Sequence, residues 1–249
     1  ILITSLIGVS SGASVGASIV IVLTGAWLQT NAVLGLSVVA LGAFIGSFLI
    51  TILVFRLSTS TLGTSVTTML LAGIAISALG GAVNSLLSYF ADNEMLRQIS
   101  IWQMGNLSTA NWTRVSIVAV VAVVVLILFP RESKSLNALL LGESEARHLG
   151  IDVQRVKKKL ILLTTLGIGT AVAVAGMIGF VGLIVPHIVR LLIGPDHRWL
   201  LPVSALAGGI LLLIADTLAR VIIAPVELPT GILTAILGAP FFIMLLIQQ

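Results

Sequence analysis

The chain has 249 residues, of which 58% are hydrophobic and 9% are charged, and its mean hydropathy is +1.19. Soluble globular domains carry about 25% charged residues, so this composition excludes an ordinary soluble domain and indicates a polytopic membrane protein. The absence of cysteine excludes disulfides, thiolate metal sites and cysteine nucleophiles. The net charge of +4 does not indicate nucleic-acid binding, because the basic residues gather in loops beside apolar segments, as membrane topology requires.

Eight apolar segments follow one another along the chain. A helix that crosses an apolar core about 30 Å thick needs roughly 20 residues. We therefore predict an all-α fold of eight membrane-spanning helices, in a single domain over residues 1–249. Pro186 lacks an amide hydrogen and is expected to break the sixth span into two pieces. The predicted spans cover residues 6–27, 32–55, 67–90, 113–129, 160–175, 180–194, 200–222 and 229–247, and residues 29–31 form the first turn.

Small and polar residues inside the first and third spans predict contacts between helices. Gly8, Gly12 and Gly16 recur every four residues on one helix face, which favours close packing against another helix over contact with a substrate. Asn84 needs a hydrogen-bond partner, because an unsatisfied amide in hydrocarbon costs several kcal/mol. Both an interhelical bond and a functional role for Asn84 remain open at this point.

Two further features lie outside the hydrophobic cores or near their ends. Residues 91–112 mix charges with Trp102 and Trp112, as is typical of an interfacial helix and loop. Asp216 and Arg220 are four residues apart, so they can pair on one helix face.

Residues 131–159 form the one long charged passage, with 7 of the 13 Lys and Arg and 4 of the 9 acidic residues. A charged side chain at the bilayer centre costs at least about 2.5–3.5 kcal/mol, so this passage is a water-facing loop and a candidate docking surface. If the loop is cytoplasmic, alternation of the spans places 10 of the 13 basic residues inside, and Arg97, Arg114 and Arg220 outside. That orientation satisfies the positive-inside rule and leaves both ends of this chain in the cytoplasm.

Five strings of sequence then carry a family resemblance. They are LIGVSSGAS (6–14), MLLAGIAISAL (69–79), LLLGESEARHLGI (139–151), GFVGLIVPHIVRLLIGPDHRWLLPVSAL (179–206) and LPTGILTAILGAPFFIMLL (228–246). In order and over nearly the whole chain, they resemble the FecCD family, the permeases of type II ABC importers for ferric siderophores, haem or cobalamin.

The resemblance implies a multi-pass protein of the bacterial cytoplasmic membrane that works as a homodimer. It implies two cytoplasmic ATPase subunits, which bind ATP and Mg, and a periplasmic or lipid-anchored substrate-binding protein. This chain is expected to bind no cofactor or metal and to have no catalytic residue. Family members have ten spans, so the eight found here would be the last eight, with the first two absent.

Individual roles are carried over by position. The resemblance implies an ATPase-coupling helix, a cytoplasmic gate near Ser65, Thr67 and Thr68, and a periplasmic Arg220 that meets the binding protein. Asp216 is expected to be the structural partner of Arg220. The residues around 139–151 alone favour a solvated surface helix, with acidic residues at its start and basic residues at its end. The implied coupling residues are Gly142, Glu143, Glu145, Ala146, Arg147, Leu149 and Gly150.

Function is expected to be ATP-driven import of an iron chelate, with cobalamin as the alternative cargo. The chain has no GxxxxGK[ST] phosphate loop, so hydrolysis is expected on a partner. A transporter driven by an ion gradient is the other class considered, and Asp216 is its one available carboxylate. His187 is expected to serve in helix packing or loop anchoring rather than as an iron ligand, and His148 and His197 are expected to be solvated in turns.

Overall fold

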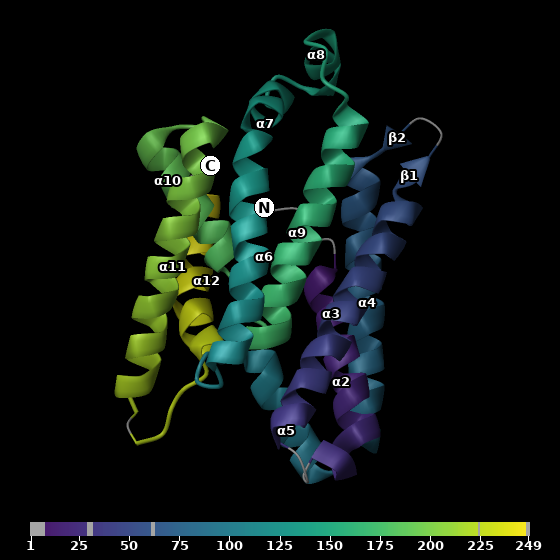
Figure 1. Cartoon of the computed structure of the whole chain (residues 1–249), viewed down its shortest axis with the longest axis vertical. Helices are drawn as coiled ribbons and strands as arrows, with labels where there is room; N and C mark the ends of the chain where they lie inside the picture. Colours follow the sequence, from purple (N-terminus) through teal and green to yellow (C-terminus); the bar gives the residue numbers. More distant parts are fainter. Residues whose placement is uncertain (1–7, 29–31, 61–62, 224, 248–249) are drawn as a thin grey trace. The chain divides into compact units, whose positions relative to one another are not determined.

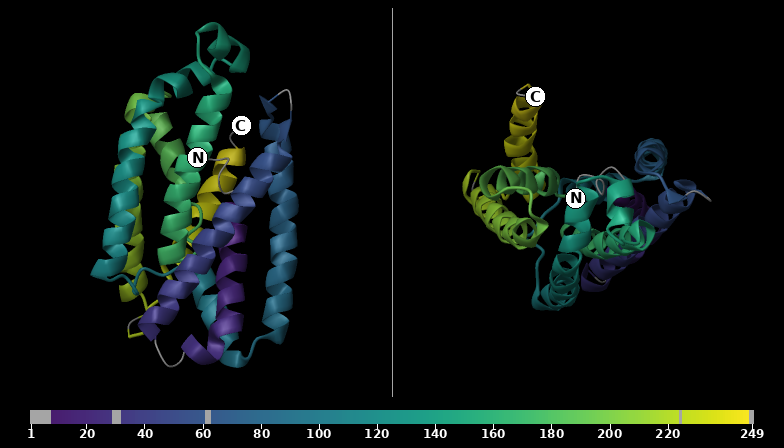
Figure 2. Two further views of the ribbon diagram at one scale, coloured as in Figure 1. Left: turned by 45° about the vertical axis from the view of Figure 1, so that its right-hand side comes forward. Right: turned by 90° about the horizontal axis from the view of Figure 1, so that it is seen from above.

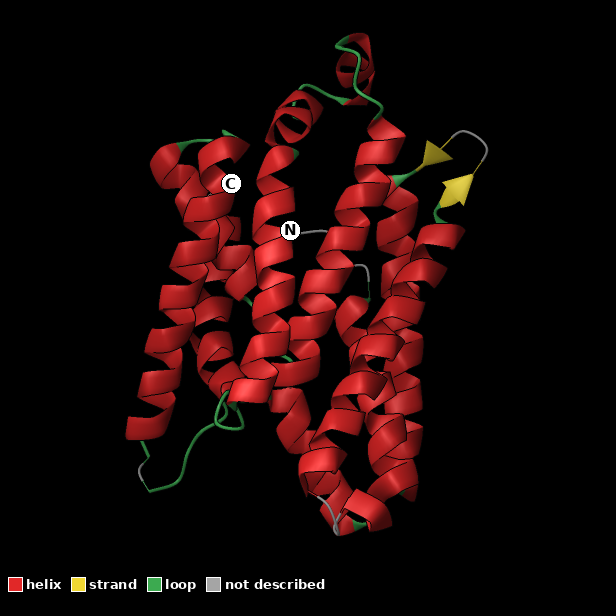
Figure 3. Ribbon diagram, viewed as in Figure 1, coloured by secondary structure: helices red, strands yellow, loops and turns green. Residues whose placement is uncertain are grey.

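The computed structural model describes residues 8–28, 32–60, 63–223 and 225–247. Within them the chain is almost entirely helical, with one short β-hairpin (Figure 3). In chain order the elements are α2 (Val9–Leu28), α3 (Ala32–Leu57), β1 (Thr59–Ser60), β2 (Gly63–Thr64), α4 (Val66–Phe90), α5 (Asn93–Met104), α6 (Trp112–Arg131), α7 (Ser133–Leu139), α8 (Glu143–His148), α9 (Val153–Ala175), α10 (Val181–Ile193), α11 (His197–Val221) and α12 (Thr230–Ile247) (Figure 1). The predicted start of the first span at residue 6 and the predicted turn at residues 29–31 lie outside the described residues.

Five helices in the described part of the chain are long and apolar enough to cross a membrane. Three further apolar helices are shorter, and they coincide with the other three predicted spans. The chain is therefore a multi-pass membrane protein, and the number of eight spans remains a prediction. The five long segments are Ser37–Leu57, Val66–Phe90, Trp112–Arg131, Val153–Ala175 and His197–Val221, and the shorter ones are Val9–Thr24, Val181–Ile193 and Thr230–Phe241.

The chain divides into two compact units, each with its own core. The first unit comprises residues 2–118 and 164–177, and the second comprises residues 119–163 and 178–249. That the two units act together as the single domain predicted over residues 1–249 stays a prediction.

In the first unit, α2 packs side by side with α3 and α4 (Figure 2). Its core face is built from small side chains: Ala13 and Ala17 are fully buried and pack with Val39 and Ala43 of α3. Small residues let two helix backbones approach closely, and this packing holds helices together where lipid provides no hydrophobic drive.

Glycines mark the closest approach of α2 to α3. A Cβ atom on Gly12 would lie only 2.5 Å from the carbonyl oxygen of Gly46, and Gly16 faces Gly42 in the same way. Gly8 differs from the expected repeat, because it precedes α2 with φ +82°. The close contact therefore depends on Gly12 and Gly16 in α2.

Asn84 of α4 has the interhelical partner that its position in an apolar helix requires. Its Nδ2 donates to Ser14 Oγ of α2 at 2.8 Å, and Gln103 Nε2 of α5 donates to the same oxygen at 3.3 Å. Ser14 thus joins three helices through one hydroxyl. Asn84 Oδ1 is buried without a hydrogen-bond partner among the described residues.

The β-hairpin between α3 and α4 departs from the all-α prediction. Thr59 pairs with Thr64 and Ser60 with Gly63, and the two threonine hydroxyls are 3.0 Å apart. The hairpin lies between the predicted spans 32–55 and 67–90, where no strand is predicted. β-Branched threonine favours extended backbone, and two residues per strand are too few to give an alternating pattern.

In the second unit, α10 packs against both α11 and α12. Val185 and Val189 of α10 form a buried cluster with Leu200 of α11. Phe180, just before α10, has φ 65° and lies close to α12, since a Cβ atom on Gly238 would be 2.4 Å from the Cβ of Phe180.

The predicted break at Pro186 is wrong. α10 runs as one continuous helix from Val181 to Ile193, with Pro186 as its sixth residue. Proline there removes a single i to i−4 hydrogen bond, and membrane helices tolerate such a loss because neighbouring groups can satisfy the freed carbonyl.

Candidate functional site

The charged passage folds as α7, α8 and the first turns of α9. We call residues 133–159 the coupling segment, after the role that the family resemblance implies for its short helix. Gly142 and Gly150 bracket α8 with φ values of 108° and 80°, a backbone conformation that only glycine adopts without strain. Glu143 and Glu145 lie in the first turn of α8, and Arg147 in its last turn, so the charges complement the helix dipole. The local helix therefore forms where the sequence predicts it.

A small apolar core holds this segment together. Ala146 of α8 has no exposed surface and packs against Ala138 of α7 and Val153 of α9. Leu149, by contrast, is 64% exposed. One face of α8 is thus fixed to its neighbours, and the rest of its surface is accessible.

Two ion pairs tie α8 and the residue before α7 to the first turns of α9. Lys157 Nζ lies 2.5 Å from Glu143 Oε1, and its side chain is only 12% exposed. Lys159 pairs with Glu132, which precedes α7 and is similarly covered. Arg147 is a weaker partner of Glu143 at 4.0 Å. Since the bracing pairs are partly buried, solvent screens them less than an exposed surface pair.

Asn137 of α7 contacts the beginning of α11. Its Oδ1 accepts from the backbone N–H of His197 at 2.9 Å and lies 2.8 Å from His197 Nδ1. Its Nδ2 donates to Asp196 Oδ1 at 2.7 Å. The expectation that His197 is only solvated is therefore wrong: the ring is half-buried and held by an amide 60 residues away.

Asp196 caps the first turn of α11. The backbone N–H of Arg198 and the side chain of Asn137 both donate to its carboxylate, and they hold its pKa below the usual value of 3.8. Hydrogen bonds of this kind favour the ionised form of a carboxyl group.

At the other end of α11, Arg220 and Asp216 form the pair that their spacing predicts. Arg220 Nε lies 2.8 Å from Asp216 Oδ2. Thr230, fully buried at the start of α12, donates from Oγ1 to Asp216 Oδ1 at 3.1 Å. The carboxylate thus joins α11 to α12, and the arginine remains 44% exposed at the side chain.

The three predicted gate residues lie at the start of α4. Ser65 is the N-cap of this helix and accepts from the backbone N–H of Thr68 at 3.4 Å. Thr67 and Thr68 are exposed. Capping accounts for Ser65 structurally, while a gating role of the three hydroxyls stays a prediction.

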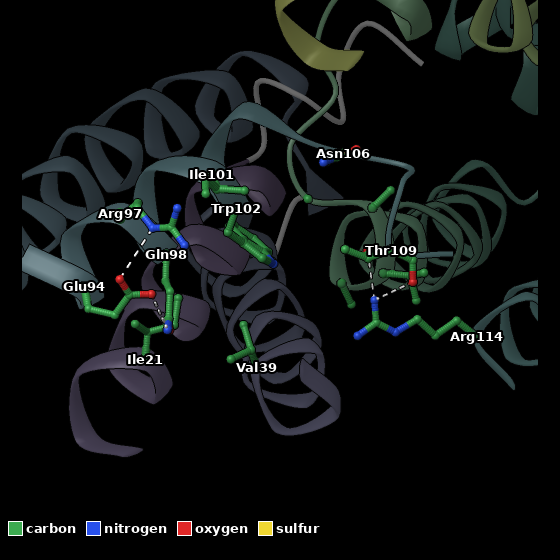
Figure 4. Close-up of a pocket in the computed structure, with 14 residues that line it drawn as sticks. Ile21, Val39, Glu94, Arg97, Gln98, Ile101, Trp102, Asn106, Thr109 and Arg114 are labelled. Atoms are coloured by element: carbon green, nitrogen blue, oxygen red, sulfur yellow. Dashed lines mark hydrogen bonds and ion pairs between the residues drawn. The ribbon is translucent and has the colours of Figure 1, made fainter. Parts of the chain in front are cut away.

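A pocket of about 320 Å³ that is not predicted from the sequence lies in the first unit (Figure 4). Trp102 and Gln98 of α5 line it, together with Arg97, whose guanidinium lies 3.5 Å from Glu94. On the other side Arg114 donates to the backbone oxygen and the hydroxyl of Thr109. Ends of helices that are distant in the sequence build it, so no local pattern reveals it.

The histidines form no metal centre. No group of three or more His, Cys, Asp or Glu residues lies close enough to hold a metal ion within the described ranges. His187 is half-buried on α10, and His148 is exposed at the end of α8. Their expected roles, packing or loop anchoring for His187 and solvation for His148, stay predictions.

Comparison with known proteins identifies the family. Residues 1–248 match the FecCD transport family. The chain is 46% identical to the hemin transport system permease protein HmuU of Yersinia pestis, covering 98% of this chain and 72% of that protein. It is 45% identical to the cobalamin import system permease protein BtuC of Halobacterium salinarum, covering 97% of this chain and 63% of that protein.

A solved structure gives the same result at the level of the fold. It is that of a candidate metal-chelate type ABC transporter in an inward-facing conformation, with a TM-score of 0.87 and 33% identity over 99% of this chain and 76% of that one. Sequence and fold therefore agree: the chain belongs to the FecCD transport family and is a permease of the ABC-importer kind.

Proposed function

We propose that the chain is the membrane-spanning subunit of an ATP-driven importer that carries an iron chelate, either haem or a ferric siderophore, into the bacterial cytoplasm. The observation that carries this proposal is the coupling segment: a permease of this family holds an exposed short helix, α8, on a braced base. A helix held rigidly by its neighbours is suited to transmit the movement of a partner subunit without deforming.

Hydrolysis belongs to a partner in this proposal. The sequence has no GxxxxGK[ST] loop to cradle phosphates, so two cytoplasmic ATPase subunits bind ATP and Mg. The exposed side chains of Glu143, Glu145, Arg147 and Leu149 contact a groove of the ATPase. Buried Ala146 fixes α8 to the segment, and Gly142 and Gly150 set its ends.

The remaining partners and sites follow the family pattern. A second copy of the chain completes a homodimer, with the pathway at the interface. Arg220, exposed at the end of α11, meets an acidic residue of a periplasmic or lipid-anchored binding protein. The hydroxyls of Ser65, Thr67 and Thr68 line a cytoplasmic gate. The closing of the ATPases moves α8, and the spans reorient around a cavity that binds the cargo weakly.

Cobalamin is an equal alternative as cargo. The hemin permease HmuU is 46% identical to this chain and the cobalamin permease BtuC is 45% identical, so sequence identity favours neither cargo. A ferric siderophore is suggested by the family resemblance. All three cargoes are bulky, and each is bound first by a separate protein in this proposal.

A transporter driven by an ion gradient has less support. It needs an intramembrane carboxylate that can exchange its ion. Asp216, the candidate, accepts from both Arg220 and Thr230, so both of its oxygens are engaged by the protein itself.

The test is uptake by proteoliposomes that contain the permease with its ATPase, with ATP inside and the cognate binding protein outside. Labelled haem, ferric siderophore and cobalamin are offered in parallel. Accumulation of one of them that requires ATP supports the proposal and names the cargo. ATP hydrolysis by the purified chain alone would contradict it.

A further inference from the structure

The parts of the coupling segment are tied to one another, as a segment that moves as one body requires. α8 shares a buried core with α7 and α9 through Ala146, Ala138 and Val153. The partly buried ion pairs of Glu143 with Lys157 and of Glu132 with Lys159 add two charged ties to the first turns of α9. A displacement of α8 is therefore carried to α7.

Asn137 connects this body to α11. Both ends of its amide are used: Oδ1 faces the backbone N–H and Nδ1 of His197, at 2.9 and 2.8 Å, and Nδ2 donates to Asp196 Oδ1 at 2.7 Å. Because an amide oxygen only accepts, the proton of the neutral imidazole is assigned to Nδ1. The three bonds fix Asn137 in position against the first turn of α11.

α11 is long enough to carry a displacement through the second unit. Its 25 residues span about 37 Å at 1.5 Å per residue. Asp196 and His197 begin it, and Asp216 and Arg220 lie near its end, where Thr230 ties it to α12. Although Pro202 lies inside α11, the helix runs without a break from His197 to Val221, so a shift at one end can reach the other.

We propose that Asn137 is a positioning residue that passes the movement of the coupling segment to α11, so that ATP hydrolysis drives transport. This inference rests on the proposed function. The covalent links of the coupling segment lead only to α6 and α9, whereas the Asn137 amide gives it a separate connection to α11.

The geometry suggests a reciprocal exchange of side chains as the test. In N137D the second carboxylate oxygen replaces Nδ2, so the bond to Asp196 is lost and two like charges face each other. Adding D196N removes one of the two like charges from this contact. Because Asp196 Oδ1 also accepts from the backbone N–H of Arg198, the introduced amide cannot cap α11 and donate to residue 137 through the same atom, so the rescue is partial. S135A, two residues away on α7, is the matched control.

The complete transporter is reconstituted in proteoliposomes with the binding protein and the cargo identified for the wild type. Cargo taken up per ATP hydrolysed is measured, and retention of the ATPase on immobilised permease is checked for each variant. N137D is expected to retain the ATPase and hydrolyse ATP but to lower the uptake per ATP about 2- to 30-fold, the range typical of coupling residues. The N137D/D196N double variant recovers part of the loss, because the charge repulsion is removed, and S135A matches the wild type.

An uptake per ATP in N137D equal to that of the wild type would overturn the inference and leave the proposed function intact. Loss of ATPase retention in N137D would also overturn it, because Asn137 would then be needed to build the docking surface. Absence of ATP-driven uptake in the wild type would refute the proposed function, and this inference with it.

Discussion

A Cβ atom on Gly16 would lie 2.1 Å from the carbonyl oxygen of Gly42, so the backbones of α2 and α3 touch where they cross. Gly16→Ala forces these helices apart and is expected to lower the free energy of unfolding by about 1–3 kcal/mol, although alanine is the better helix former. Thermal unfolding in detergent measures the change. Gly81→Ala, in α4 with open space around it, is the matched control and is expected to be neutral or stabilising. Equal stability of the two variants would contradict the close contact.

Thr230→Val tests the link between α11 and α12. Valine keeps the shape of threonine but removes the hydroxyl that donates to Asp216. A hydrogen bond to a charged acceptor contributes about 1.5–3 kcal/mol, and the variant is expected to lose an amount of this order in the free energy of unfolding. Thr217→Val is the control, because the Thr217 hydroxyl donates to the carbonyl of Leu213 within its own helix. An equal loss of unfolding free energy in Thr217→Val would contradict a specific stabilising role of the hydrogen bond from Thr230 to Asp216.

Arg220→Gln tests the docking of the binding protein. Glutamine can still donate to Asp216, but the positive charge is lost from an exposed position. Exposed ion pairs contribute about 0–1 kcal/mol, so the affinity of the binding protein is expected to fall by up to about fivefold. The effect should shrink at high salt, because ions screen exposed charges. Arg198→Gln, at the opposite end of α11, should leave the affinity unchanged; the same loss in both variants would argue against a local contact at Arg220.

Asp196→Asn tests the ionised cap of α11 through its pH dependence. The folded protein holds the pKa of Asp196 below 3.8, because Arg198 and Asn137 donate to its carboxylate. A carboxyl group whose pKa is lower in the folded state stabilises the fold fully at any pH above its unfolded pKa. This stabilisation is lost as the pH falls through the folded pKa. The variant should therefore unfold at a lower temperature than the wild type at pH 7, and the difference should narrow below pH 3.8. A difference that widens in acid would contradict the assigned bonds.

Hydrophobic runs predicted the helices well, because a membrane span requires a continuous apolar segment whatever its neighbours are. The same local logic predicted the pair of Asp216 and Arg220, which depends only on helical spacing. It also predicted α8, whose bounding glycines and end charges are adjacent in the sequence. Asn84 illustrates the limit of this logic: the need for a partner was predictable, but Ser14 as that partner was not.

Features that depend on residues far apart in the chain could not be predicted from the sequence. Asn137 and His197 are 60 residues apart, and neither lies in a pattern that points to the other. Thr230 bonds to Asp216 only because α12 returns beside α11. Pro186 was misread for a different reason: local chemistry argued for a break, but the surroundings of α10 permit one missing hydrogen bond.

The pocket beside Trp102 depends on a close backbone approach that local patterns do not reveal. A Cβ atom on Gly176, after α9, would lie 2.3 Å from the carbonyl oxygen of Trp102. The backbone N–H of Asn106 also donates to the carbonyl of Ala175 at 2.8 Å. Two segments some 70 residues apart in the sequence thus form one wall of this pocket.

The source of energy is the most direct test of the central claim. In proteoliposomes holding the permease and its ATPase, cargo accumulation is measured with ATP, with a non-hydrolysable ATP analogue, and with ATP plus ionophores that collapse proton and sodium gradients. The account predicts accumulation with ATP that the ionophores leave unchanged and the analogue abolishes. Accumulation that persists with the analogue and stops with the ionophores would contradict it and would return attention to Asp216.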